Sequence, residues 1–392
     1  LEMERSVQFI KDSASSISGK IPLLCGYMEV SEYDIIGGVA IREHLRRQID
    51  DFIKIGVDVI HIHGLRNKDN YFVTSQAVRA IHHYLFTNGR RHKVSLIASG
   101  GIRLASDSQK TIQRGAEATL IDFAALLALD PYAYKATFED KTTTDKLMHL
   151  DIKWAAKRLN NLMESRKVQI LEVLGAAGFK DMKKTVGEEG RLIDFYHLEE
   201  RIEKNIFENE EKLRQYIRLN HRLMEDESYS KDGFLKFSDL KKKIVPLKSP
   251  HDFYELGDVN QTVYQRDHVW PGDLIETIGR MAAGDANMQF LKNVKATGLL
   301  GDGFDVMKIL YQQDPDMIPE KELEDIQTAV YLDKDLVLRA PWTFGGKSVG
   351  SIGLDTWRSH VLAARELGIQ YDTGEGGYPT SFFLNRKGEP IF

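Results

Sequence analysis

A short apolar run ends in a double-glycine turn at Val94-Ser95-Leu96-Ile97-Ala98-Ser99-Gly100-Gly101-Ile102-Arg103. Such a run is typical of a parallel strand that is buried on both faces. The turn leads into a helical stretch that starts near Ser106. Two glycines let backbone N–H groups approach an anion closely, and the start of a helix adds positive potential. The sequence therefore predicts a phosphate-binding turn in an α/β fold.

Three more apolar runs of similar length lie on either side of this stretch, at 21–24, 57–63 and 118–123. Helix-period stretches separate the runs, at 41–55, 75–87 and 106–114. Strands that alternate with helices favour a parallel sheet of the α/β class. The end of the chain repeats the pattern, with strand-like runs at 336–340 and 369–372 around a helical stretch at 356–367.

Helix-rich sequence separates these two α/β blocks. Residues 146–225 predict nearly continuous helix, 228–265 a polar connector with two prolines, and 266–330 further helix. We therefore expect three parts. They are an α/β part at 1–145, a helical part with its connector at 146–330, and a second α/β part at 331–392.

The composition is that of an ordinary globular protein, with 42% hydrophobic and 28% charged residues over 392 positions. A net charge of −5 and only short basic runs argue against nucleic-acid binding. No apolar stretch approaches the ~18 residues that a membrane span needs. The single cysteine, Cys25, cannot form an internal disulfide or hold an iron–sulfur cluster alone. It favours a reducing, cytoplasmic setting.

A second glycine-containing stretch follows the double-glycine turn, at 115–123, and ends another strand-like run. In phosphate-binding (β/α)8 barrels, the loops after the seventh and eighth strands hold one phosphate together. We therefore expect one anion at two adjoining strand ends, with a purely structural turn as the alternative for the glycine pair. The expected ligands are Gly100, Gly101, Ile102, Arg103, Asp122 and Phe123.

Two further glycine-rich turns follow strand-like runs near the end of the chain, at 340–348 and 372–379. In the first, small residues let a flat ring lie on the backbone. In the second, three glycines surround Glu375, so the loop can wrap a ligand and aim that carboxylate at it. The expected cofactor contacts here are Thr343, Phe344, Gly345, Thr373 and Gly374. Each turn is also compatible with a tight structural turn.

Two histidines end the strand-like run at 57–63. His61 and His63 share one face of the strand because alternate residues point the same way. With no third ligand nearby in the sequence, we expect no metal site. The histidines then serve either as donors to a bound ligand or as hydrogen-bonded structural side chains.

Together, these motifs resemble the FMN-binding synthase domain of glutamate synthase and its stand-alone relatives. The family's Thr-Gly-Glu-Gly-Gly is matched by 373–377, and its Gly-Gly-Ile/Leu-Arg by 100–103, followed by a Gly-Ala pair at 115–116. The family's Ala-Asp-x-Ile-x-Ile-x-Gly is matched by 57–64, where the histidines occupy two of the open positions. The resemblance implies a TIM-type (β/α)8 barrel that binds FMN.

The order of the motifs is unusual for this family. Its members run from the Thr-Gly-Glu-Gly-Gly strand towards the Gly-Gly-Ile-Arg strand, whereas here the Thr-Gly-Glu-Gly-Gly block ends the chain. We therefore expect a circularly permuted barrel with a helical elaboration. The pattern shows six of eight strands. In family order, residue 392 is followed by residue 1, and the third and fourth strands would fall at that junction. Either a short segment is absent there, or the two are weak strands within 1–20 and 380–392.

Two departures from the family change the expected chemistry. The family's cysteine trio is replaced by 124–131, so no iron–sulfur cluster is expected. The family's substrate-binding lysine on the fifth strand has no counterpart at 23–27, which leaves Lys347 or Arg103 as carboxylate anchors. We therefore expect a catalytic set of Glu375 and His63, with Lys347 in place of the missing family lysine.

The resemblance implies reductive amination of a 2-oxo acid through an imine, with glutamate as the product. It also implies separate subunits that supply ammonia and electrons, a small-molecule substrate and a homo-oligomer. Two alternatives remain open. One is an FMN oxidoreductase that acts on a different amine or acid, and the other is a non-catalytic barrel that serves as a subunit.

Overall fold

The structure is a computed structural model in which most of the α/β sequence is described. Its described residues are 23–67, 71–130, 150–194, 269–270, 272–284, 307–311, 317–333 and 336–374, with 304 and single positions within 5–13.

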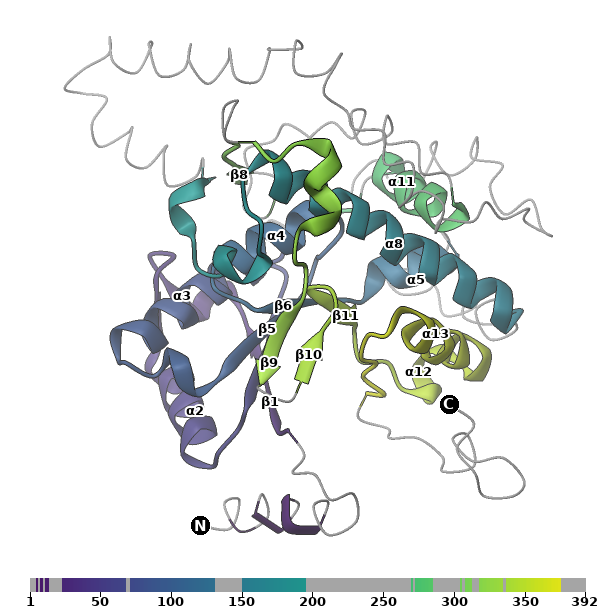
Figure 1. The fold of residues 1–392 in the computed structure, drawn as a ribbon. Helices are drawn as coiled ribbons and strands as arrows, with labels where there is room; N and C mark the ends of the chain where they lie inside the picture. Colours follow the sequence, from purple (N-terminus) through teal and green to yellow (C-terminus); the bar gives the residue numbers. More distant parts are fainter. Residues whose placement is uncertain are drawn as a thin grey trace.

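Five parallel strands form the central sheet (Figure 1). In spatial order they are β1 (Cys25–Val30), β4 (Val59–Gly64), β5 (Ser95–Ser99), β6 (Ala118–Ile121) and β11 (Trp342–Phe344). A parallel bridge between Phe344 and Tyr371 continues the sheet beyond β11. The α/β class is thus confirmed. The described strands do not close on themselves, so the eight-stranded barrel stays a prediction.

Three of the predicted strands lie where the apolar runs placed them, at β4, β5 and β6. The prediction of a strand at 21–24 is wrong for its described half, because β1 begins only at Cys25. Leu24 instead joins the turn before β4, where its N–H donates to Asp58 Oδ2 at 2.8 Å. β1 then alternates exposed and buried side chains, which is the pattern of a strand with one open face.

Helices between the strands cover one face of the sheet. They are α2 (Glu43–Lys54), α3 (Thr74–Thr87), α4 (Ala105–Gln113) and α5 (Phe123–Leu129). The apolar faces of α2 and α3 form one hydrophobic cluster with the buried side of β1, β4 and β5, which includes Ile60, Ile62 and Ala98. The three predicted helices at 41–55, 75–87 and 106–114 are therefore confirmed within a few residues.

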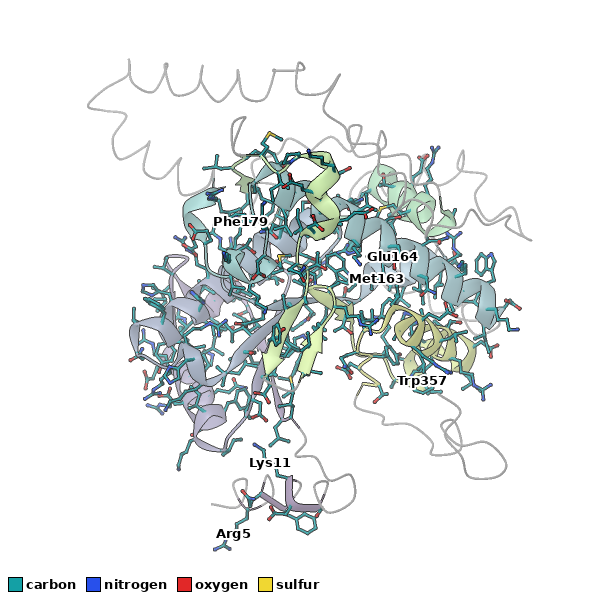
Figure 2. All side chains as sticks on the ribbon, in the orientation of Figure 1. Arg5, Lys11, Met163, Glu164, Phe179 and Trp357 are labelled. Atoms are coloured by element: carbon teal, nitrogen blue, oxygen red, sulfur yellow. The ribbon has the colours of Figure 1, made fainter. Side chains whose placement is uncertain are left out.

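A second helical layer packs around α8 (Ile152–Ala176), which lies against α4, α5, α11 (Gly272–Ala283) and α13 (Leu354–Leu367) (Figure 1). One hydrophobic cluster runs through these helices and includes the fully buried Trp342 and Trp357. Figure 2 labels Trp357 and Met163, which both belong to it. Helices from the middle and the end of the chain thus share a core. The predicted connector at 228–265 lies outside the described residues.

The predicted strand at 336–340 is confirmed in its first half, but its pairing differs from that of a barrel strand. Its first half is β10 (Leu336–Leu338), which pairs antiparallel with β9 (Val330–Asp333), and the main sheet receives β11 instead. The hairpin lies beneath the amino end of β5, where Ser95 Oγ donates to the carbonyl of Leu332 at 2.7 Å. The predicted strand at 369–372 is reduced to the single bridge at Tyr371.

Short elements complete the described chain. The two remaining strand pairs are β2 (Ile35–Ile36) with β3 (Ala40–Ile41) and β7 (Leu192–Asp194) with β8 (Met307–Ile309). The short helices are η1 (Glu32–Asp34), η2 (Arg91–Lys93), η4 (Met182–Thr185), η5 (Glu189–Arg191), η11 (Glu320–Asp325) and α12 (Val349–Ile352). None of the described helices has the length and apolar character needed to cross a membrane.

Candidate functional site

Polar side chains gather on the face of the sheet that the α2–α5 helices leave uncovered. The register pairs His63 with Ser99 across β4 and β5, and Thr343 with Leu120 across β11 and β6. Alternation places Thr119 on the opposite face, where its hydroxyl lies 2.8 Å from Ser108 of α4. We call the other face, which carries His61, His63 and Ser99, the histidine face.

One hydroxyl bridges the two histidines on this face. Ser99 Oγ lies 2.7 Å from His61 Nε2 and 2.7 Å from His63 Nδ1. The ring of Tyr27 on β1 meets His61 edge-on at 5.1 Å between centroids and lies roughly parallel to His63 at 6.3 Å. The strand register thus converts two separate sequence motifs into one connected group.

The surroundings keep His61 neutral. Burial lowers the pKa of His61 from 6.5 to about 4; His63 lowers it further, and the carboxylate of Asp122 opposes the shift. Because a neutral imidazole has one N–H and one bare nitrogen, His61 acts as both donor and acceptor. His61 can therefore either donate to or accept from a neighbouring hydroxyl.

The double-glycine turn follows β5 and is closely packed. Gly100 and Gly101 have positive φ angles of 105° and 68°. A Cβ on Gly100 would lie 2.4 Å from the carbonyl oxygen of Gly64, and one on Gly101 would lie 2.5 Å from the ring of Phe72. Packing alone therefore requires glycine here, so the glycines by themselves do not distinguish a binding turn from a structural one.

The hydrogen bonds of the turn are more informative. Asp107 Oδ2 accepts from the backbone N–H groups of Arg103 and Leu104, at 3.1 and 3.2 Å. Among the described residues, no group accepts from the N–H groups of Gly100, Gly101 and Ile102, although all three residues are buried. Buried backbone N–H groups are almost always paired, so three adjacent donors of this kind indicate a place for an acceptor from outside the described residues.

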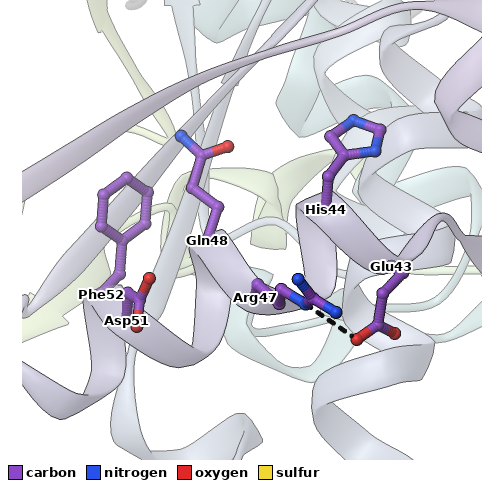
Figure 3. Close-up of a pocket in the computed structure, with 6 residues that line it drawn as sticks. All are labelled: Glu43, His44, Arg47, Gln48, Asp51 and Phe52. Carbon is purple, nitrogen blue, oxygen red and sulfur yellow. Dashed lines mark hydrogen bonds and ion pairs between the residues drawn. The ribbon is translucent and has the colours of Figure 1, made fainter.

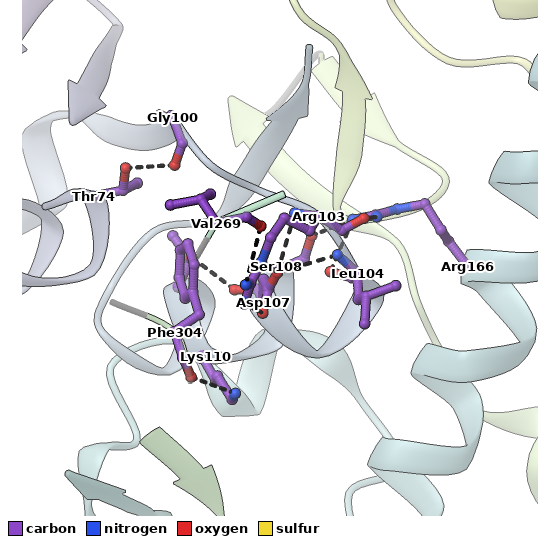
Figure 4. Close-up of polar contacts among 11 residues, drawn as sticks. Thr74, Gly100, Arg103, Leu104, Asp107, Ser108, Lys110, Arg166, Val269 and Phe304 are labelled. Atoms are coloured by element: carbon purple, nitrogen blue, oxygen red, sulfur yellow. Dashed lines mark hydrogen bonds and ion pairs between the residues drawn. The ribbon is translucent and has the colours of Figure 1, made fainter. Parts of the chain in front are cut away.

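Positive charge lies next to the residues that follow the turn, where Arg166 reaches Arg103 and Leu104 (Figure 4). Arg166 of α8 is fully buried and donates to the carbonyl of Arg103 at 2.6 Å, the carbonyl of Leu104 at 3.2 Å and Ser108 Oγ at 2.8 Å. Burial lowers its pKa to about 10, with Asp107 opposing, so it remains a cation. The guanidinium of Arg103 is held by Asp107, with Nε to Oδ2 at 2.9 Å.

The next strand end lies against the first glycine-rich turn of the last part. The N–H of Gly345 donates to the carbonyl of Ile121 at 2.8 Å, and a Cβ there would lie 2.8 Å from the Cβ of Asp122. Asp122 caps α5 by accepting from the N–H of Phe123. The ring of Phe123 meets Trp270 edge-on at 4.9 Å between centroids.

Lys347 lies between two carboxylates at this end of the sheet. Burial lowers its pKa, and Asp122 and Asp372 both act against that shift. Asp372 Oδ1 accepts from the N–H of Gly374 at 2.8 Å, and a Cβ on Gly374 would lie 2.8 Å from the backbone nitrogen of Ser348. The two glycine-rich turns of the last part are therefore packed together.

Not every expected residue faces this place. The ring of Phe344 points into the helical layer and meets His360 edge-on at 5.2 Å, so only its backbone borders the histidine face. The hydroxyl of Thr343 donates to the carbonyl of Gln370. Thr373 is half-buried. Glu375 lies outside the described residues.

Sequence reasoning missed Ser99, Asp372 and Tyr27 as members of the site. Ser99 and Asp372 each end a strand-like run directly before a glycine-rich turn, which was a usable signal. Nothing in the local sequence pairs Tyr27 with His61, because that contact depends on strand register.

Two hollows lie away from this face. One of about 590 Å³ has a lining that, among the described residues, comes from α2 between Glu43 and Phe52 (Figure 3). The other, of about 340 Å³, lies between α8 and the residues around Arg339 and Trp342. Within the described ranges, no cluster of three histidine, cysteine or acidic side chains could hold a metal ion.

Comparisons with known proteins locate a glutamate synthase-like region in the chain. Residues 72–180 match the family described as the conserved region in glutamate synthase. Over 123 residues, the chain is 35% identical to the archaeal glutamate synthase (NADPH) of Methanocaldococcus jannaschii, covering 30% of this chain and 24% of that protein. The archaeal-type glutamate synthase (NADPH) of Dehalococcoides mccartyi is 31% identical over 143 residues, covering 32% and 29%.

A third relative, the archaeal glutamate synthase (NADPH) of Archaeoglobus fulgidus, is 28% identical over 170 residues, covering 36% of this chain and 31% of the relative. The matches therefore span about a quarter to a third of the length of these proteins. No solved structure matches the chain.

Proposed function

From the glutamate synthase-like region at residues 72–180, we propose that this chain is an FMN-dependent oxidoreductase that reductively aminates a 2-oxo acid. The reaction of the resembling family proceeds through an imine and yields glutamate. The matched region contains the double-glycine turn and α8, which are the parts that supply unpaired donors and positive charge.

The proposal rests on the N–H groups of Gly100, Gly101 and Ile102, which have no acceptor among the described residues. They fit a phosphate group, because its oxygens accept several hydrogen bonds and its charge suits the buried cation of Arg166. In this proposal the FMN phosphate binds the turn and the neighbouring strand end at Asp122 and Phe123. Arg103 then contributes through its backbone, since its guanidinium is paired with Asp107.

The flat part of the cofactor is assigned to the adjoining strand end. The strand next to β6 is β11, and its end carries Thr343, Phe344 and Gly345. The turn with Thr373 and Gly374 packs beside this strand end. Flavin, when bound, supplies the hydride chemistry, while the protein positions it and the substrate. The residues of the chain bind the flavin, orient the substrate and transfer protons.

Three side chains are assigned to the substrate. Lys347 anchors its carboxylate, His63 faces it as a proton donor, and Glu375 orients ammonia or carries a proton. Lys347 suits this role because the carboxylates of Asp122 and Asp372 lie near it. The carboxylate of a bound substrate can replace one of them as the partner of the ammonium group.

The permuted barrel belongs to the same proposal. This is supported by the sheet order β1-β4-β5-β6-β11, which continues to Tyr371 and brings β11 beside the first α/β block. In family order these strands are the fifth to eighth, then the first and second. In a circularly permuted barrel, the eighth strand in family order pairs with the first, as β6 pairs with β11 here.

Other parts of the proposal concern the setting. We include separate subunits that supply ammonia and electrons, a homo-oligomer, a cytoplasmic location supported by the single cysteine, and no iron–sulfur cluster. A second candidate is an FMN oxidoreductase for a different amine or acid. The lack of a lysine at 23–27 favours it.

The deciding experiment is a spectrum of the purified protein followed by titration with FMN and with riboflavin. We expect flavin absorption, FMN release near one per chain, and FMN binding at least tenfold tighter than riboflavin binding. Equal affinity for both would remove the phosphate assignment. A protein that neither carries nor takes up FMN would leave the non-catalytic subunit as the remaining reading. Turnover with 2-oxoglutarate then separates the two enzyme candidates.

A further inference from the structure

We infer that His61, Ser99 and His63 form a proton wire on the histidine face, which carries a proton from His61 Nδ1 to His63 Nε2. Ser99 Oγ lies at hydrogen-bond distance, 2.7 Å, from both rings. The delivery of that proton to a substrate rests on the proposed function, but the wire itself depends only on these three side chains.

A serine hydroxyl has a single hydrogen, so Ser99 donates to one ring and accepts an N–H from the other. In the first arrangement it donates to His63 Nδ1 and accepts from His61 Nε2, which leaves the proton of each neutral ring on Nε2. In the second arrangement both contacts are reversed, and each ring carries its proton on Nδ1. The bridge therefore forces the two rings into the same tautomer.

Conversion of the first arrangement into the second moves one proton along the chain of contacts. A proton binds His61 Nδ1, the Nε2 proton of His61 passes to Ser99 Oγ, and the hydroxyl proton passes to His63 Nδ1. The Nε2 proton of His63 then leaves. Three bonds to hydrogen form and three break, with no change of oxidation state.

Neither end of the wire is bonded to another described residue. Within the described part of the chain, no hydrogen bond is formed by His61 Nδ1 or by His63 Nε2. His360 is different, because its Nδ1 is bonded to the carbonyl of Thr356 and its Nε2 is sealed without a partner. His82 is also different, since its Nδ1 accepts from Arg91 Nε at 3.1 Å.

Charged and titratable groups from three neighbouring elements face the wire. β1 contributes Tyr27 against both rings and Glu29 opposite His63 in the register. The strand end after β6 contributes Asp122, which favours a proton on His61, and Lys347 lies beyond it. The effect of burial is larger than that of Asp122, so His61 stays neutral between transfers.

The test is nitrogen-15 NMR of the full chain with labelled histidine, using long-range proton–nitrogen spectra from pH 5 to 9. Each signal is assigned by a single His→Gln substitution. We expect His61 and His63 to report the same tautomer, or the same average of two, at every pH where both are neutral. His360, protonated on Nδ1, and His82, protonated on Nε2, serve as internal references.

Two variants on β5 isolate the bridge. Ser99→Ala should abolish the match between the two rings while the fold is retained. Ser95→Ala removes a hydroxyl from the same strand and face, bonded to Leu332, and should leave the match intact. Ser99→Thr keeps a hydroxyl and should preserve the match between the two rings. This variant serves as the test if Ser99→Ala fails to fold.

Opposite tautomers in the unaltered protein would overturn the wire, as would a match that survives Ser99→Ala. FMN titration of the same samples separates the two proposals. Coupled histidines without FMN binding contradict only the proposed function, and FMN binding with uncoupled histidines contradicts only the wire.

Discussion

At the scale of single residues, Gly101 and Gly89 offer a matched pair. Both have positive φ, 68° and 64°, but a Cβ on Gly89 meets nothing within 4 Å, whereas one on Gly101 meets the ring of Phe72. Both alanine variants should lose roughly 1–2 kcal/mol through backbone strain. Only Gly101→Ala should also weaken FMN binding, by at least tenfold, because the clash displaces the turn. Urea unfolding and FMN titration check this, and equal FMN affinity in both variants would contradict the phosphate site.

At the scale of elements, α8 supports two different parts of the molecule through two buried arginines. Arg166 bonds the double-glycine turn, while Arg158 bonds the carbonyls of Ala128 in α5 and Gly279 in α11. Replacement of either by methionine leaves buried carbonyls unpaired, so we expect each to cost about 3–5 kcal/mol of stability. Only Arg166→Met should reduce the preference for FMN over riboflavin. If Arg158→Met reduces that preference equally, the arginine behind the turn has no special role.

At the scale of the whole molecule, three histidines in different places predict acid lability. Burial lowers the pKa values of His61, His82 and His360 from 6.5 to about 4. Below pH 6.5 the unfolded chain therefore binds protons that the folded chain does not. Stability should fall as the pH drops towards 4, with a slope of up to about 1.4 kcal/mol per pH unit for each histidine. Urea midpoints measured at pH 7 and pH 5 test this, and His360→Phe should make the slope shallower. A midpoint that does not change between pH 7 and pH 5 would contradict the prediction.

The sequence predicts those parts of the structure that depend on residues close together in the chain, and it misses those that depend on pairing between distant segments. Helical spacing located α3, α4 and α13, and an apolar run located β5, because each pattern depends on neighbouring residues. The apolar run at 336–340 located a strand, β10, but not its partner, because such a run does not tell a hairpin strand from a sheet strand. Pairing decides that, and β11 pairs with a strand more than two hundred positions away.

The candidate site shows the same division. Its glycine-rich turns and His63 were visible as motifs, since each lies at the end of a strand-like run. The bridge through Ser99 was not, because it requires the register that sets His63 opposite Ser99. The neutrality of His61 likewise follows from burial and from Asp122, which belong to the assembled sheet.

The pairing of β6 with β11 also bears on how the protein is made. About 220 residues separate Ile121 from Trp342, so a ribosome that adds ~5–20 residues per second needs roughly 10–40 s to pass from one to the other. Throughout that interval the nascent chain presents β6 as an unprotected edge, and such an edge invites pairing with other chains. Slower translation lengthens this exposure, so the yield of native protein should depend on chaperone capacity and on growth temperature more steeply than its folded stability would indicate.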